Sequence, residues 1–358
     1  MLWVDRYRPK SLDALITNKD IGANLKNLVA EGDCPHLLFY GPSGAGKKTL
    51  ILALLREMFG PGAEKLKPET KEWKIERPSM SKGVEVELTT LSSMYHIELN
   101  PSDAGLKDKY IVQEVIKETA KYRQLDTANT SSKGFKVIVL NEVDRLTRDA
   151  QYGLRRTMEK YASACRLILV CNNISKVTEA VRSRCLCVRV PAPEESQICD
   201  VLEHVARKEG LTLPSELAAR IATGSDRNMR KALLCMEACK VNQYPFTPTQ
   251  AVQTMDWELY VQEIAQEILN EQSPKCLFQV RQKLYDLLIN CIPPELILKT
   301  LMTQLMTKLD SELKHEVCFW AAHYEHSLTS GSKAIIHLEA FVAKFMSVYK
   351  HFVISMFG

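Results

Sequence analysis

A glycine-rich segment, Gly41-Pro42-Ser43-Gly44-Ala45-Gly46-Lys47-Lys48-Thr49, constrains this chain more than any other feature. It follows an apolar run at 36–40 and precedes apolar residues at helical spacing from Ile51 to Met58. In such a strand, loop and helix order, glycines let backbone N–H groups surround phosphate oxygens, and a lysine at the helix start supplies positive charge. The segment therefore predicts a phosphate-binding loop whose residues all contribute to a nucleotide site. An ordinary glycine-rich turn is the alternative.

Two residues depart from the usual form of this motif. The residue after the lysine is normally Ser or Thr, whose hydroxyl binds Mg²⁺, but here it is Lys48. Thr49 does not replace it, because one residue along a helix turns the side chain by about 100°. In the acidic strand at 137–144, Asn141 stands where a hydrolysing enzyme usually has aspartate, while Glu142 keeps a carboxylate that can polarise water. We expect a site that binds nucleotide, holds Mg²⁺ poorly and hydrolyses slowly; the alternative is a working ATPase that tolerates both changes.

Short apolar runs alternate with helical patterns between residues 37 and 190, which is typical of a parallel sheet covered by helices on both faces. The runs lie at 36–40, 96–99, 135–140, 167–171 and 186–190. They predict an α/β domain with a five-stranded parallel sheet. The segment 61–94 contains two stretches with period-two alternation, at 73–76 and 84–88, and we interpret it as an inserted hairpin.

The chain of 358 residues is long enough for two or three domains. Pro191-Ala192-Pro193 ends the sheet-forming part, since proline cannot continue a central strand, and the residues after it have helical spacing. A linker rich in Pro, Thr and Gln follows at 245–253. We therefore expect an α/β domain at 1–192, a small helical domain at 193–250 and an all-α domain at 254–358.

Composition and local sequence exclude several other classes of protein. The formal net charge is only +4, so any contact with nucleic acid depends on local patches. The cysteines are scattered, with no Cys/His cluster at zinc spacing, so we expect reduced thiols and no metal site built by the chain alone. Charges within the first six residues argue against a secretory signal. The most apolar long stretch, 284–309, contains charges and two prolines, so we expect no membrane segment.

An ordered set of motifs resembles one family, the AAA+ clamp loaders, and within it the small subunits of eukaryotic replication factor C. Besides the glycine-rich segment, the set consists of WVDRYRP at 3–9, ELNPSD at 98–103, NEVD at 141–144, LRRTME at 154–159, CNN at 171–173, SRC at 183–185 and NMRKAL at 228–233. Each motif alone is weak evidence for the family, but all of them in this order are specific for it. The resemblance implies a RecA-like AAA+ P-loop domain, a small helical lid and an all-α collar that joins subunits.

The resemblance also implies roles for single residues of the nucleotide site. Val4, Arg8 and Pro9 would lie beside the adenine. Asn172 would act as sensor 1 and detect the γ-phosphate, and Arg230 would act as sensor 2 from a lid helix. Together with the glycine-rich segment these residues form the predicted binding site for ATP or ADP.

Arg184, in the Ser-Arg-Cys motif, would act on a neighbouring subunit. A guanidinium is permanently charged and planar, so offered across an interface it can stabilise the charge that builds up on a transferring γ-phosphoryl group. We therefore expect Arg184 to be an arginine finger in trans. The alternative is that Arg182, Arg184 and Arg189 form a solvated edge of the last strand.

Two short segments carry candidate contacts to DNA phosphates, which would follow a duplex without reading its bases. They contain Lys107, Lys109, Arg145, Thr147 and Arg148. A charged, solvated helix face is the alternative for any of them.

By resemblance, the chain would be one of five subunits of a nuclear clamp loader. It would assemble with four related subunits and use ATP to help open the sliding clamp, proliferating cell nuclear antigen, and load it at primer-template DNA in replication and repair. Lys48 and Asn141 make the chain most similar to one member of the family. By resemblance, that member lies at one end of the arc of subunits, and its own nucleotide site hydrolyses ATP weakly. Two alternatives remain: an autonomous homo-oligomeric AAA+ ATPase motor, and a scaffold that binds no nucleotide.

Overall fold

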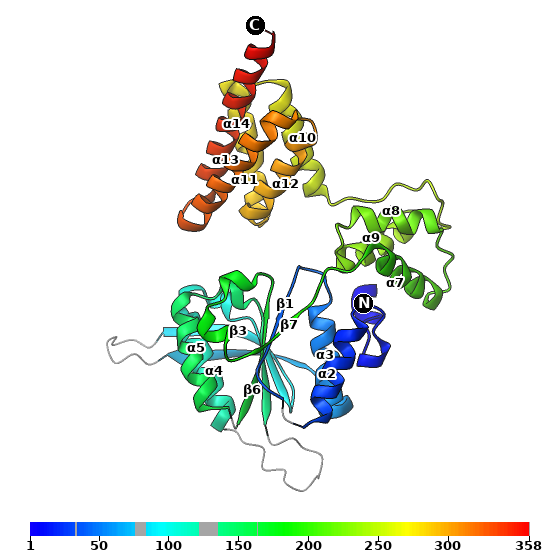
Figure 1. Cartoon of the computed structure of the whole chain (residues 1–358), viewed down its shortest axis with the longest axis vertical. Coiled ribbons are helices and arrows are strands. Elements are labelled where there is room, and N and C mark those ends of the chain that lie inside the picture. The colour runs from blue at the N-terminus through cyan, green and yellow to red at the C-terminus, as the bar shows by residue number, and fades with distance from the viewer. Residues whose placement is uncertain (33, 76–83, 122–134, 163, 358) are drawn as a thin grey trace. The chain divides into compact units, whose positions relative to one another are not determined.

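The computed structural model describes residues 1–32, 34–75, 84–121, 135–162 and 164–357. The chain forms two compact units, Met1–Val252 and Gln253–Gly358. In Figure 1 the first unit runs from blue to green and the second from yellow to red.

A seven-stranded sheet organises the first unit, in the order β2-β3-β4-β5-β6-β1-β7. The strands are β1 (Leu37–Tyr40), β2 (Lys67–Ile75), β3 (Val84–Ser92), β4 (His96–Leu99), β5 (Lys136–Leu140), β6 (Cys165–Cys171) and β7 (Leu186–Arg189). The block β4-β5-β6-β1-β7 is parallel, which confirms the five predicted strands. The predicted hairpin is β2 and β3, but it pairs antiparallel with β4 and so enlarges the sheet. Period-two alternation shows that a segment is extended, not which strand it joins.

Alternate residues of the central strands face two separate layers of helices (Figure 1). On one face, Leu37 and Phe39 pack with α2 (Lys19–Ala30) and α3 (Lys47–Phe59). On the other face, Leu38 packs with the helices α4 (Asp108–Lys121) and α5 (Arg148–Lys160). The short helix α6 (Glu179–Arg182) precedes the edge strand β7. Short 3-10 helices complete this part at Leu12–Ala14, Gly60–Glu64, Pro101–Lys107, Val143–Arg145 and Ile174–Lys176.

Three helices after the sheet share a small core with the N-terminus of the chain. They are α7 (Glu195–Lys208), α8 (Ser215–Gly224) and α9 (Met229–Asn242). Their buried side chains include Leu202, Leu217 and Met236, and Trp3 of α1 (Trp3–Arg6) packs among them. The backbone N–H of Trp3 donates a hydrogen bond to Glu237 of α9 (3.1 Å). The first residues of the chain are therefore fixed against this helical part.

One edge of the sheet collects the segments that carry the motifs. The strands β1, β4, β5 and β6 are parallel, so their carboxyl ends lie at the same edge, where ligands of open α/β sheets usually bind. The turn after β1 needs a glycine, because a Cβ built on Gly41 (φ 152°) would lie 2.0 Å from the carbonyl oxygen of Val190, which follows β7. Gly41 thus lets the phosphate-loop segment pass directly over the end of β7.

The second unit is a bundle of α10 (Asp256–Asn270), α11 (Pro274–Ile289), α12 (Pro294–Met306), α13 (Ser311–Ser330) and α14 (Ala334–Phe357). Its core contains Ile264, Leu301 and Phe341, which are almost fully buried. Large apolar side chains remain at its surface, among them Phe278, Ile289 and Phe319, each about two-thirds exposed or more. None of the helices in the described residues is long and apolar enough to span a membrane.

Candidate nucleotide-binding site

A cavity of about 940 Å³ opens at the carboxyl edge of the sheet in the first unit. Most of the predicted nucleotide-binding residues line it together with the candidate catalytic residue Glu142; they are Val4, Arg8, Pro9, Ser43, Gly44, Ala45, Gly46, Lys47, Lys48, Thr49, Asn172 and Arg230. Gly41 and Pro42 are not among its described lining residues; their carbonyl groups instead contact Lys47. Residues up to 229 positions apart in the sequence thus surround one space.

Lys47 is a buried cation held by neutral oxygens. Its Nζ donates hydrogen bonds to the carbonyl oxygens of Gly41 (2.6 Å) and Pro42 (2.9 Å) and to Oδ1 of Asn172 (2.8 Å). The residue is only 8% exposed. Burial lowers the pKa of Lys47, and the charge of Arg230 lowers it further, while Asp144 acts in the opposite direction. An anion in the cavity would stabilise the charged form of this lysine.

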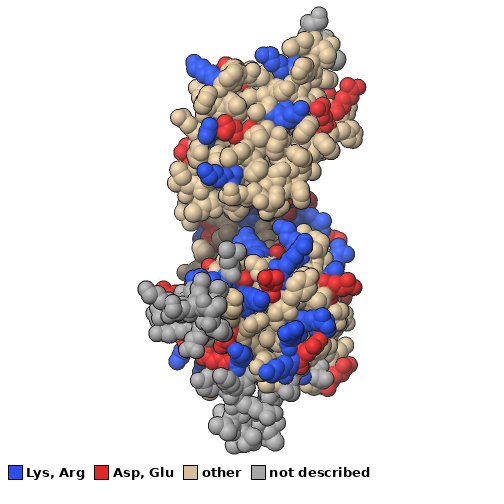
Figure 2. Space-filling model, turned by 90° about the vertical axis from the view of Figure 1, so that its left-hand side faces the viewer, with Lys and Arg blue, Asp and Glu red and all other residues tan. Residues whose placement is uncertain are grey.

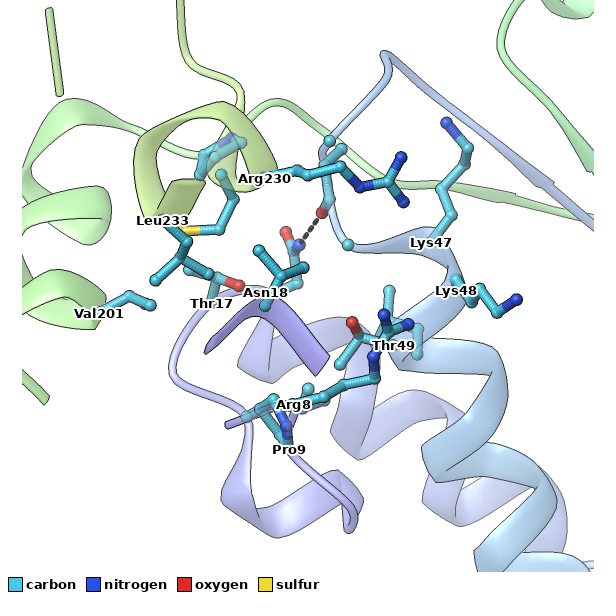
Figure 3. A pocket seen from close by; sticks show the side chains of 18 of the residues that line it. Arg8, Pro9, Thr17, Asn18, Lys47, Lys48, Thr49, Val201, Arg230 and Leu233 are labelled. Atoms are coloured by element: carbon cyan, nitrogen blue, oxygen red, sulfur yellow. Dashed lines mark hydrogen bonds between the residues drawn. The ribbon is translucent and has the colours of Figure 1, made fainter. Parts of the chain in front are cut away.

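Lys48 leaves α3 in a different direction from Lys47 (Figure 3) and contacts a carboxylate. Its Nζ donates to Oε1 of Glu98 at the end of β4 (2.7 Å), and Nδ2 of Asn141, which follows β5, donates to the same oxygen (2.8 Å). The two residues that depart from the usual motif therefore meet at one atom. In the described segments, no group of three or more His, Cys, Asp or Glu side chains is arranged to hold a metal ion.

The two other acidic residues after β5 have different roles. Glu142 has a left-handed backbone (φ 53°), and its carboxylate forms an ion pair with Arg145 (2.9 Å). Asp144 accepts hydrogen bonds from the backbone N–H groups of Asn172 and Asn173 (3.2 Å each). Asp144 therefore positions the segment that follows β6, and through Asn172 it is connected to Lys47.

The lid contacts the phosphate loop through Asn228. This residue caps α9, because its Oδ1 accepts hydrogen bonds from the N–H groups of Arg230 (3.1 Å) and Lys231 (3.2 Å). A Cβ built on Gly44 would lie 1.8 Å from the same Oδ1, so the glycine is needed for this approach. Figure 3 shows the side chain of Arg230 extending from α9 toward the loop.

Several lining residues were not predicted from the sequence. Asn18 has a left-handed backbone before α2, and its Nδ2 donates to the carbonyl oxygen of Ala45 (3.5 Å; dashed line in Figure 3). On α7, Val201, His204, Val205 and Lys208 line the cavity with one helix face. The helical period predicts that these four share a face, but no motif marks that face as a ligand surface. No motif or pattern in the sequence marks Asn18 as a residue of the cavity.

The cavity carries a marked excess of positive charge. Among its described lining residues the acidic side chain is Glu142, and the basic ones are Arg6, Arg8, Lys10, Lys47, Lys48, Lys208 and Arg230. Such a lining attracts a polyanion of nucleotide size, since clefts with one sign of charge concentrate ligands of the opposite sign.

Arg184 lies apart from this cavity and does not appear among its described lining residues. Its Nε donates to Oε1 of Glu159 on α5 (2.6 Å), and an Nη donates to the carbonyl oxygen of Ala180 (2.7 Å). Its side chain is 26% exposed, between α6 and the edge strand β7. The guanidinium is therefore held in one orientation at an edge of the sheet.

The candidate DNA contacts gather where α4 and α5 begin. Asp108, the first residue of α4, accepts hydrogen bonds from the backbone N–H (2.7 Å) and hydroxyl (3.0 Å) of Thr147, the N-cap of α5. Lys107 and Lys109 flank Asp108, and Arg145 and Arg148 flank this cap. Arg145 and Arg148 are exposed, whereas the Thr147 hydroxyl is occupied by capping. On the face over α4 and α5 in Figure 2, basic and acidic side chains are interspersed.

Known proteins match all parts of this architecture. Residues 17–194 match the family described as DNA polymerase III, delta subunit, residues 200–241 the RCF1/5-like AAA+ ATPase lid domain, and residues 257–353 the replication factor C subunit 3 C-terminal domain. A solved structure of the Thermotoga maritima RuvB Holliday junction branch migration motor matches with a TM-score of 0.50 at 15% identity, over 73% of this chain and 79% of that one. This last likeness shows the P-loop fold alone, which is one that binds nucleotides.

Full-length relatives are much closer in sequence. Replication factor C subunit 5 of Oryza sativa is 63% identical and subunit 3 of Arabidopsis thaliana is 62% identical, both over the whole of each chain. Replication factor C subunit 3 of Homo sapiens is 56% identical over 98% of this chain and 97% of its own. The P-loop cavity, the lid and the helical bundle described above, together with these relatives, show that the chain belongs to the replication factor C subunit family.

Proposed function

We propose that the chain is a nucleotide-binding subunit of the replication factor C clamp loader, which uses ATP to open a sliding clamp and load it onto primer-template DNA. The observation that carries the nucleotide role is the basic cavity at the carboxyl edge of the sheet, with Lys47 buried in its wall and hydrogen-bonded to three neutral oxygens. A nucleotide phosphate supplies the negative charge that this site lacks.

Within the cavity, the phosphates of ATP or ADP bind the N–H groups of the 41–49 loop and Lys47. Asn172 and Arg230 approach the same phosphates from β6 and from the lid, supported by their contacts with Asp144 and Asn228. The adenine lies against the N-terminal residues Val4, Arg8 and Pro9 and the α7 face, which line the same cavity.

Hydrolysis in this cavity is weak or absent. Glu142 is paired with Arg145, and Asn141 brings no negative charge to the site. A general base accelerates hydrolysis only with a well-held water and a stabilised leaving group. This arrangement disfavours the autonomous homo-oligomeric motor, and the basic cavity disfavours a scaffold without nucleotide.

Arg184 acts in trans as an arginine finger. It lies on an edge of the sheet, away from the chain's own cavity, and Glu159 with the Ala180 carbonyl fixes its guanidinium. A charge fixed in this way can approach the ATP of a neighbouring subunit without a large loss of side-chain entropy.

The second unit is the collar through which the chain joins four related subunits in a hetero-pentamer. Exposed Phe278, Ile289 and Phe319 support this role, since large apolar side chains at a surface favour protein contacts. The face of this unit in Figure 2 is mostly uncharged. The division at 1–192, 193–250 and 254–358 into AAA+, lid and collar domains is part of the proposal.

Contacts with DNA are to phosphates, through Lys107, Lys109, Arg145 and Arg148 around the cap formed by Thr147. These residues can follow a duplex backbone without reading its sequence. Because the clamp acts in the replication of chromosomal DNA, the chain functions in the nucleus.

Reconstitution of the clamp loader tests the proposal. With the other four subunits, the sliding clamp, ATP and primed DNA, addition of this chain is expected to restore loading, measured as clamp retained on circular DNA. Loading that is equal with and without the chain would contradict it. A homo-oligomer of the chain alone that hydrolyses ATP rapidly would favour the motor instead.

A further inference from the structure

One carboxylate oxygen joins two residues that line the cavity, Lys48 and Asn141, which replace the magnesium-binding residues of a P-loop. Glu98 Oε1 accepts hydrogen bonds from Lys48 Nζ at 2.7 Å and from Asn141 Nδ2 at 2.8 Å. The side chain of Glu98 is 7% exposed, while that of Lys48 is 44% exposed. The carboxylate is thus buried, whereas the Lys48 side chain is partly exposed and lines the cavity.

These residues do not fit a magnesium ion. Mg²⁺ requires oxygen ligands in nearly octahedral geometry, and a P-loop normally supplies a Ser or Thr hydroxyl and an aspartate. Here Lys48 and Asn141 present N–H hydrogens, and both hydrogens point at Glu98. A divalent cation at this place would meet an ammonium group that already neutralises the carboxylate.

The two replacements balance each other in charge. With aspartate at 141, the pair of carboxylates at 98 and 141 would carry two negative charges, which a divalent cation neutralises. With Asn141 only the charge of Glu98 remains, and one lysine neutralises it. The absence of an aspartate at position 141 and the presence of Lys48 therefore compensate each other in charge. Either change alone would leave an unbalanced charge beside Glu98.

We propose that the Lys48 ammonium group takes the place of Mg²⁺, so that the chain binds the phosphates of ATP or ADP without a divalent cation. This inference rests on the proposed nucleotide binding. Lys48 lines the same cavity as Lys47, and a lysine ammonium is a compact point charge with three donors. Glu98 and Asn141 hold it on the metal side of the phosphate loop.

The alternative is that Lys48 and Glu98 form an ion pair of structural value only. An ion pair whose lysine is partly exposed to solvent contributes little to stability. Such a pair would leave the dependence of nucleotide binding on metal unchanged, and this difference makes the two cases separable.

The test is equilibrium binding of ATP and of ADP to the full-length chain, by calorimetry, with excess Mg²⁺ and with EDTA. We expect the two dissociation constants for each nucleotide to agree within about threefold. A loss of affinity of about tenfold or more in EDTA would overturn the inference while leaving nucleotide binding intact. Absence of binding under both conditions would instead overturn the proposed function, and this inference with it.

Variants at position 48 sharpen the test. Lys48→Thr removes the ammonium and restores the usual hydroxyl, so affinity in EDTA is expected to fall by about tenfold and to recover in part with Mg²⁺, most fully with Asn141→Asp added. Lys48→Arg keeps the charge and should remain independent of metal. Lys26→Thr is a matched control, since Lys26 also pairs with a carboxylate (Asp13, 2.7 Å) but does not line the cavity. Equal affinity of Lys48→Thr and wild type in EDTA would overturn the role of Lys48.

Discussion

In the nucleotide cavity Lys47 is buried and donates hydrogen bonds to neutral oxygens, whereas Arg184, at the edge of the same sheet, pairs directly with the carboxylate of Glu159. The first arrangement leaves a positive charge unbalanced until an anion arrives. The second holds a charged group ready but out of its own chain's cavity. On the proposed roles, one domain combines a receiving site at Lys47 with a donating site at Arg184, and the two differ in whether the protein itself supplies the counter-charge.

The largest expected effect concerns the donating site. Arg184→Ala in the assembled clamp loader should lower hydrolysis at the neighbouring subunit's site by roughly 10³-fold, because the charge on the transferring phosphoryl group loses its partner. Nucleotide binding by this chain should not change. Single-turnover hydrolysis by the complex measures the first effect and calorimetry the second. Arg189→Ala, on the exposed end of β7, is the control and should leave hydrolysis unchanged. Unchanged hydrolysis for Arg184→Ala as well would mean that these arginines form a solvated strand edge.

The receiving site should respond differently. Lys47→Ala is expected to weaken nucleotide binding by this chain about a hundredfold, or about 2.7 kcal/mol, since it removes the charge nearest the loop. The finger role of Arg184 should survive in the complex. Titration with labelled ATP measures the change, with Lys26→Ala as control. A nucleotide affinity unchanged by Lys47→Ala would break the comparison, because the cavity would then not be the binding site.

Gly41 lies between the phosphate loop and the edge strand β7, because its backbone approaches the carbonyl group of Val190 just after that strand. Gly41→Ala should destabilise the chain by about 2 to 3 kcal/mol, through a clash between the new Cβ and a backbone carbonyl that cannot move easily. Gly32→Ala, also at a positive φ (83°) but with open space around the Cβ, should cost only about 1 kcal/mol. Urea unfolding measures both, and equal costs would show that the contact with Val190 is not a constraint.

The smallest expected effect concerns the reactivity of the cysteine thiols. Burial raises the pKa of Cys171, beside the cavity, and of Cys185, next to Arg184, each to about 12. At pH 8 the thiolate fraction of either is then about 10⁻⁴, and raising the pH toward 12 increases it. We expect iodoacetamide at pH 8 to modify the exposed cysteines Cys187, Cys291 and Cys318 first, as read by mass spectrometry. Early modification of Cys171 or Cys185 would show that one of the two regions opens readily.

Features that lie within one continuous segment could be predicted from the sequence. The 41–49 loop, the five parallel strands and the position of Arg184 before the last strand each depend on local pattern or motif order. The parallel pairing then brings Asn141 and Asn172 to the same edge as Lys47, because each follows a strand end.

Contacts between distant segments could not be predicted in the same way. Lys48 and Asn141 could each be recognised as departures, but their meeting at Glu98 joins positions 50 and 43 residues apart. The approach of Asn228 to Gly44 depends on how the lid packs, which no period in the sequence encodes. The hairpin's place in the sheet was missed for the same reason.

The most direct measurement is steady-state ATP hydrolysis by the isolated full-length chain with Mg²⁺, beside nucleotide binding on the same sample. The account predicts clear binding with turnover far below 1 per second, since the cavity attracts phosphate but lacks the residues that hold a catalytic metal ion. Turnover of the order of 1 per second or more, within the usual enzyme range, would contradict it and show that Lys48 and Asn141 belong to a working ATPase.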